Sequence, residues 1–151
     1  MFSTVRYFIK TSFLFFIIGF LSGLYLYAAR TFGWQYPLTL VTAHTHVLLV
    51  GGMMMMILGV AVWFFPRPTK DDKRYVPERI QKFYWLFTIA TLARFIFEIL
   101  SGIWYGQQWI DVTAFAGATL QVMGMIGLIW SLWGRIRAVG SQIREDRGEK
   151  F

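Results

Sequence analysis

The sequence contains no cysteine among its 151 residues. Without thiols the chain can form no disulfide, offer no thiolate to a metal and attach no c-type heme covalently. It also has no glycine-rich phosphate loop, no paired nucleophile and base, and no acidic cluster suited to a hard cation. These absences leave the apolar segments and the two histidines as the informative features.

Charged residues are missing from long stretches of the chain, which is 56% hydrophobic and 19% aromatic. Residues 11–29, 31–66 and 112–134 carry no charge, and residues 83–104 carry only Arg94 and Glu98. Each stretch reaches the roughly 20 residues that a helix needs to cross a bilayer. The sequence therefore predicts an all-α membrane protein of one domain. Its four transmembrane helices are expected at about 7–28, 40–65, 81–104 and 112–132, with a charged cytoplasmic tail over 135–151.

Basic residues outnumber acidic ones, 15 to 8, and the net charge is +7. Thirteen of the fifteen lie near the N-terminus, in the loop 67–82 or in the tail from residue 135. By the positive-inside rule, both termini and the middle loop are cytoplasmic, in the inner membrane of a prokaryote. The distribution of basic residues thus indicates how the chain is oriented in a lipid bilayer, and we expect no nucleic-acid partner.

The N-terminal region resembles a signal peptide in having a basic start, residues 1–10, before an apolar core, residues 11–29. The apolar core is longer than that of a signal peptide, so we expect it to be retained as the first transmembrane helix.

Small and flexible residues suggest how the helices pack. Gly19 and Gly23 stand four apart in the first helix, and Gly117, Gly124 and Ser131 stand seven apart in the fourth. Small residues at such spacings let membrane helices approach closely. Gln121 is expected to form a helix–helix hydrogen bond.

Methionines 53–56 point all round a helix, which favours packing over a copper(I) site.

The only histidines, His44 and His46, lie near the start of the second predicted helix. Side chains two residues apart on a regular helix point about 200° apart, so the pair cannot bind one metal ion and must face two neighbours. Two buried histidines with ordinary hydrogen bonds are one interpretation. Two imidazoles at one depth in a membrane favour a ligand role, and heme takes one imidazole on each side.

The third predicted helix contains a charge pair, Arg94 and Glu98, four residues apart. The two charges could simply neutralise each other so that the helix can insert. Intramembrane charges also mark functional sites, and Glu98 lies at about the depth of the histidines. We therefore assign both residues to the surroundings of a bound heme. Arg94 would stabilise a propionate or neutralise Glu98, and Glu98 would accept a proton or hydrogen-bond a ligand histidine.

The segment Thr42-Ala-His-Thr-His-Val-Leu-Leu-Val-Gly-Gly52, followed by Phe64-Phe-Pro-Arg67, resembles a ligand-bearing helix of heme-copper oxidase subunit I. The similarity is to the C-family cytochrome oxidases and nitric oxide reductases. In that family twelve helices form three arcs of four, and the second helix of one arc carries a His-x-His pair that serves two hemes. The resemblance implies that this chain is equivalent to one arc and that His44 and His46 bind heme b. The family's copper-binding histidines have no counterpart here, so oxygen reduction is not implied.

These observations favour a heme b cytochrome with bis-histidine iron ligation, used for electron transfer or heme handling, with a quinol or a cytochrome as redox partner. One alternative is a small heme-dependent reductase of nitric oxide or oxygen, which would make the chain an enzyme. A weaker one is a copper-handling protein. Because His44 and His46 face apart on one helix, the second imidazole for each heme must come from another copy. The three arcs of the family point to a homotrimer with heme at each subunit interface.

Overall fold

The structure is a computed structural model that describes residues 3–66, 73–137, 140, 143 and 147–148. Within these residues every regular element is helical. The elements are α1 (Ser3–Phe32), α2 (Thr39–His46), the π-helix η1 (Val47–Met54), α3 (Met55–Phe64), α4 (Pro77–Ile103), α5 (Gln108–Leu132) and the 3-10 turn η2 (Trp133–Arg135). Four spans are long and apolar enough to cross a membrane: Thr4–Phe32, Thr39–Phe64, Pro77–Ile103 and Gln108–Arg135. The prediction of an all-α chain with four membrane-spanning helices is confirmed.

Most helices extend beyond their predicted ends, and local chemistry explains where they stop. α1 continues to Phe32 and ends before Gly33, whose φ of +72° suits a residue without a side chain. α3 ends because Phe65 precedes Pro66 and takes an extended ψ of 144°. α4 begins with Pro77 at its first position, where no backbone N–H is needed. Pro68, a second proline two residues further on, lies outside the described residues.

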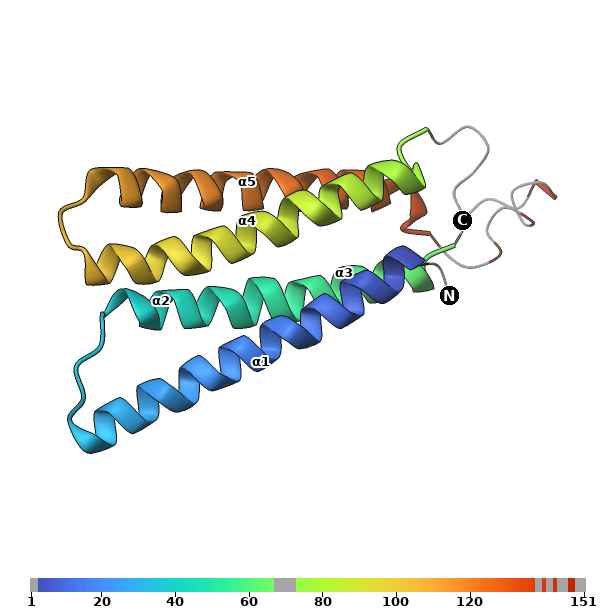
Figure 1. Ribbon diagram of the computed structural model, residues 1–151. Coiled ribbons are helices and arrows are strands. Elements are labelled where there is room, and N and C mark those ends of the chain that lie inside the picture. Colours follow the sequence, from blue (N-terminus) through green and yellow to red (C-terminus); the bar gives the residue numbers. More distant parts are fainter. Residues whose placement is uncertain (1–2, 67–72, 138–139, 141–142, 144–146, 149–151) are drawn as a thin grey trace.

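The helices stand in an open row (Figure 1). α1 lies along the continuous rod of α2, η1 and α3, this rod meets α4, and α4 lies along α5. Within the described part of the chain, α1 and α5 do not meet, so the row is not closed into a bundle. The connections 33–38 and 104–107 lie together at one end, here called the loop end. The N-terminus lies at the opposite end, the terminal end (Figure 1).

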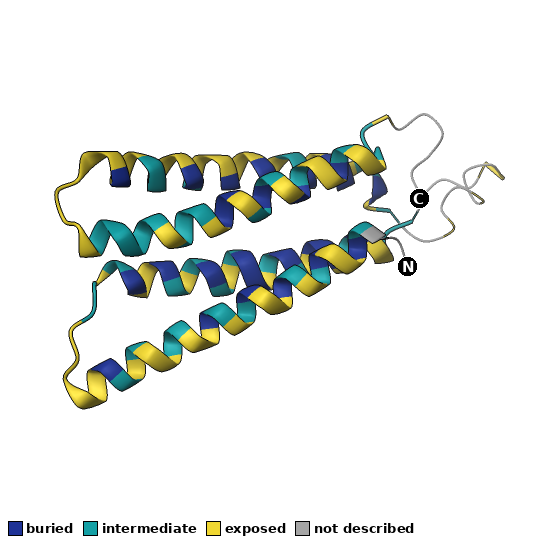
Figure 2. Ribbon diagram, viewed as in Figure 1, coloured by how far each residue is buried: buried dark blue, intermediate teal, exposed yellow. Residues whose placement is uncertain are grey.

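The hydrophobic core occupies the middle and the terminal end of this row (Figure 2). Its members include Val5 and Phe8 at the start of α1, Val62 near the end of α3, Ile80 at the start of α4 and Leu132 at the end of α5, all at most 3% exposed. Toward the loop end, α1 is exposed around most of its surface (Figure 2). The apolar core therefore reaches Val47, directly after His46, and thins out beyond it toward the loop end.

Small residues hold α5 close to α4, as predicted. A methyl group added to Gly117 would lie 3.1 Å from the backbone nitrogen of Arg94, and one added to Gly124 would lie 3.2 Å from the Cα of Phe87. Ser131 continues this face and is fully buried. The short distance between the two helices is what lets a polar side chain on α5 reach α4.

Arg135, the first residue of the predicted charged tail, is buried against the end of α3. Only 4% of Arg135 is exposed. Its guanidinium donates hydrogen bonds to the carbonyl oxygens of Val62, Phe65 and Pro66, at 3.0, 2.6 and 2.8 Å, and lies 4.3 Å from the ring centroid of Tyr75. These carbonyls belong to the end of α3, where the helix leaves acceptors without intrahelical donors. Arg135 is thus a cap for α3, and most of the predicted tail lies outside the described residues.

Candidate functional site

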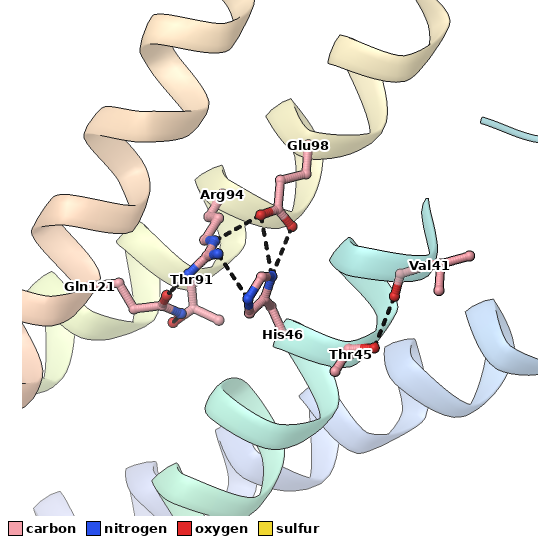
Figure 3. Close-up of polar contacts among 7 residues, drawn as sticks. All are labelled: Val41, Thr45, His46, Thr91, Arg94, Glu98 and Gln121. Atoms are coloured by element: carbon pink, nitrogen blue, oxygen red, sulfur yellow. Dashed lines mark hydrogen bonds and ion pairs between the residues drawn. The ribbon is translucent and has the colours of Figure 1, made fainter. Parts of the chain in front are cut away.

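His46, the last residue of α2, reaches across to α4 (Figure 3). Its Nδ1 lies 3.2 Å from each carboxylate oxygen of Glu98, and its Nε2 lies 2.8 Å from Nη2 of Arg94. A guanidinium can only donate hydrogen bonds, so Nε2 must offer its lone pair to Arg94. The ring proton is then on Nδ1, which donates to Glu98. The network therefore selects one tautomer of His46.

Arg94 is the centre of this network and uses all three of its nitrogens. Its Nε donates to Glu98 at 2.9 Å, its Nη1 donates to Oε1 of Gln121 at 2.9 Å, and its Nη2 donates to His46. Gln121 in turn donates to the hydroxyl of Thr91 at 2.9 Å. The charges of Arg94 and Glu98 cancel, and each polar group has a partner, which is the condition for keeping such groups inside a membrane.

His44 points the other way, toward α1. Its Nδ1 lies 2.9 Å from the carbonyl oxygen of Gly19, which can only accept, so Nδ1 carries the proton here as well. One turn further along α1, a methyl group on Gly23 would lie 2.7 Å from Cε1 of the ring. Gly23 therefore leaves the space that the imidazole occupies. The prediction that His44 and His46 face two different neighbours is confirmed.

Directly after His46 the chain changes from an α-helix to the π-helix Val47–Met54, which the sequence did not predict. Each turn of a π-helix is wider than an α-helical turn, and such segments are common at functional sites. The segment lies close to α1, because methyl groups on Gly51 and Gly52 would lie 2.8 Å and 2.7 Å from ring carbons of Phe15 and Phe16. Ser12, fully buried, donates to the carbonyl oxygen of Gly52 at 2.8 Å.

A cavity of about 280 Å³ adjoins His46. Its polar wall is formed by His46, Arg94 and Gln121. The remaining lining is apolar: Val50, Phe87, Val122, Met125 and Ile126. Val122 and Ile126 are 56% and 60% exposed on α5, so the cavity opens on the side of the row. An apolar cavity with a few convergent polar groups is the usual form of a ligand site.

The sequence predicted part of this site. Depth and polarity assigned Arg94 and Glu98 to the surroundings of a heme bound by the histidines, and the structure brings both residues into contact with His46. Gln121 forms the expected helix–helix hydrogen bond, but its partners, Arg94 and Thr91, were not predicted. The i, i+3 spacing of Thr91 and Arg94 on one face of α4 was the available signal.

The side chains of the methionine run do not share one environment. Met55 is fully buried, whereas Met53 is 49% exposed, so the two side chains face different surroundings as predicted. Among the described residues, no three His, Cys, Asp or Glu side chains gather as a metal-binding group.

No protein-family model, curated protein or solved structure matches this chain.

Proposed function

We propose that this chain is a heme b-binding membrane protein in which His44 and His46 are the axial ligands of the iron, serving electron transfer or heme handling. The observation that carries the proposal is the shared tautomer of the two imidazoles. Each holds its proton on Nδ1, against Gly19 in one case and Glu98 in the other, so each has its lone pair on Nε2. Ligand histidines in metal proteins are oriented in this way, by a carbonyl or a carboxylate on the second ring nitrogen.

The chemical character of the residues around His46 suits a heme. The cavity beside His46 is apolar apart from its His46, Arg94 and Gln121 wall, as a macrocycle with an apolar face requires. Heme supplies one-electron redox chemistry when bound. Glu98 would orient the ring and increase the basicity of the ligand nitrogen, and Arg94 would balance its charge.

The two ligands of one iron would come from different copies of the chain. His44 contacts α1 and His46 contacts α4 of the same chain, so the two imidazoles lie on different sides of α2 and would not reach one iron within one copy. The open row leaves the cavity beside His46 accessible from the side, where a second copy could bring its His44. Such a head-to-tail contact closes into a ring when the rotation between neighbouring copies permits it. The resemblance to subunit I favours three copies, with both termini on the cytoplasmic side of a prokaryotic inner membrane.

The test is a spectrum of the purified protein with heme, reduced with dithionite, before and after carbon monoxide. An unchanged six-coordinate spectrum supports two protein ligands on the iron. A large shift would instead indicate an open site and favour a nitric oxide or oxygen reductase. Stoichiometric copper without iron in the purified protein would favour the copper-handling alternative.

The assembly is tested separately by mass. The mass of the heme-loaded protein in nanodiscs should correspond to three chains and three hemes. A monomer with full heme content would refute ligation between copies.

A further inference from the structure

The network around Arg94 contains hydrogen-bond donors that the described residues do not use (Figure 3). A guanidinium has five N–H groups and a side-chain amide has two. Arg94 donates once from each of its three nitrogens, so Nη1 and Nη2 each keep a second N–H. Gln121 donates to Thr91 and keeps one N–H, although only 3% of this residue is exposed. Donors without an acceptor are costly in hydrocarbon, so these groups indicate a ligand that brings an acceptor.

The cavity beside His46 has the size and lining for an aromatic ring. Arg94 and Gln121 lie on its wall, and its volume is about 280 Å³. An apolar cavity of about 150 Å³ is enough to hold benzene, so a ring with substituents has room here. Phe87, which is fully buried, and Met125 also line the cavity. Aromatic and thioether side chains both pack well against a ring.

The depth of the site restricts the ligand to molecules dissolved in the bilayer. Gln121 is thirteen residues from Gln108, the first residue of α5, and eleven from Leu132, the last. At about 1.5 Å per residue, these separations are about 20 Å and 17 Å along the helix axis. The hydrocarbon layer is about 30 Å thick, so Gln121 lies near its centre, far from phospholipid headgroups. The exposed Val122 and Ile126 line the cavity on its open side, so a ligand enters laterally from the lipid.

The charges of the site favour an uncharged acceptor. Arg94 and Glu98 already form an ion pair, with 2.9 Å between Nε and Oε1. A carboxylate or a phosphate would therefore bring an unpaired negative charge to the centre of the membrane, which is costly. A carbonyl oxygen accepts hydrogen bonds without adding a charge.

From the spare donors, the cavity and its depth we infer that this site binds a lipid-soluble carbonyl compound, and an isoprenoid quinone in its oxidised form is the chemical class that fits. One quinone carbonyl accepts from Arg94 and Gln121, the ring packs against Phe87, and the tail leaves past Val122 into the lipid.

The inference does not rest on the proposed function. It uses the network in the form that the structure shows, with both ring nitrogens of His46 hydrogen-bonded. Iron ligation by His46 would break its bond to Arg94 and would use the space beside it. One copy of the chain therefore binds a quinone or a heme at His46, but not both.

The experiment measures equilibrium binding to the full-length protein, produced without heme and placed in nanodiscs. The probe is decylubiquinone, and binding to protein-free nanodiscs is subtracted. We expect saturable binding of one probe per chain, with the infrared carbonyl band of the bound probe moved to lower frequency by the hydrogen bonds. Arg94→Met should weaken binding by about tenfold to a hundredfold, because a hydrogen bond to a charged group contributes that factor.

A second variant leaves the Arg94 network intact and decides the matter if Arg94→Met does not fold. Val122→Trp places an indole at the open side of the cavity and should abolish saturable binding. Met123→Trp is the matched control: Met123 is the next residue of α5, is also 56% exposed and does not line the cavity, so its replacement should leave the dissociation constant unchanged.

Three results would overturn the inference: no saturable binding to the wild type, equal binding to Val122→Trp and Met123→Trp, or an unshifted carbonyl band. Displacement of the probe by lauric acid at equal concentration would overturn it too, since a carboxylate would then be the preferred ligand. Heme uptake by the same protein separates this inference from the proposed function. Heme that depends on both histidines, without quinone binding, would refute the quinone site alone, whereas quinone binding to a protein that takes up no heme would refute the proposed function alone.

Discussion

The ion pair between Arg94 and Glu98 should contribute to stability as a unit, whether or not heme is bound. The Nε–Oε1 distance is 2.9 Å, and the two side chains are only 18% and 15% exposed. Glu98→Gln keeps the shape and the hydrogen-bonding capacity but leaves the guanidinium without its counter-charge. Removing one partner of a fully buried pair costs about 3–5 kcal/mol, and because these side chains are not fully buried we expect about 2–4 kcal/mol.

Arg94→Gln should cost a similar amount, since it leaves the carboxylate paired only with a neutral imidazole. The double variant removes both charges together. Its loss of unfolding free energy should be smaller than the sum of the two single losses by about 0.5–3 kcal/mol, the range measured for interacting neighbours. The assay is reversible unfolding in mixed micelles of detergent and SDS, followed by circular dichroism. Glu78→Gln, at the exposed start of the same helix, should change stability by less than about 0.5 kcal/mol. Additive single and double losses would refute the view that the pair acts as a unit.

Three further predictions concern other parts of the chain. Gly23→Ala should displace the imidazole of His44, because the added methyl group would lie 2.7 Å from Cε1, and the low-spin heme signal should fall while the helical content by circular dichroism is retained. Arg135→Met should destabilise the protein by about 2–4 kcal/mol in the same unfolding assay, since three carbonyls lose a charged donor, whereas Arg6→Met, at an exposed position, should have little effect. A reporter that is active only in the periplasm, fused after Phe151, should give no signal, and a strong signal would refute cytoplasmic termini.

The membrane-spanning helices were predictable because their signal is local. Uncharged runs of about 20 residues define them, and proline and glycine mark their ends. The opposite directions of His44 and His46 were predictable for a similar reason: the angle between two side chains on a helix follows from its period. The spacing of Gly117 and Gly124 predicted close packing, and the structure places α4 against both.

The contacts across helices were less predictable because they depend on how each helix is rotated about its axis. Depth placed Glu98 near His46, but depth cannot tell which face of α4 meets α2. The π-helix after His46 has no composition that distinguishes it from an α-helix of the same residues. The contacts of Arg135 were not predicted, because its position after the last apolar run says nothing of its partners, which are carbonyls some 70 residues earlier in the chain.

Because both histidines lie on one helix, the proposed function requires more than one copy of the chain. A four-helix chain that bound heme as a single copy would place its two ligands on different helices that face a common space. Here the ligand nitrogens belong to rings that contact α1 and α4, on either side of the same rod. The open row is consistent with this, because closing α1 onto α5 within one chain would use the edges that two copies need for contact. Under the proposed function such a chain would gain its binding site by association, and within one copy the Arg94 network already satisfies both ring nitrogens of the partly exposed His46.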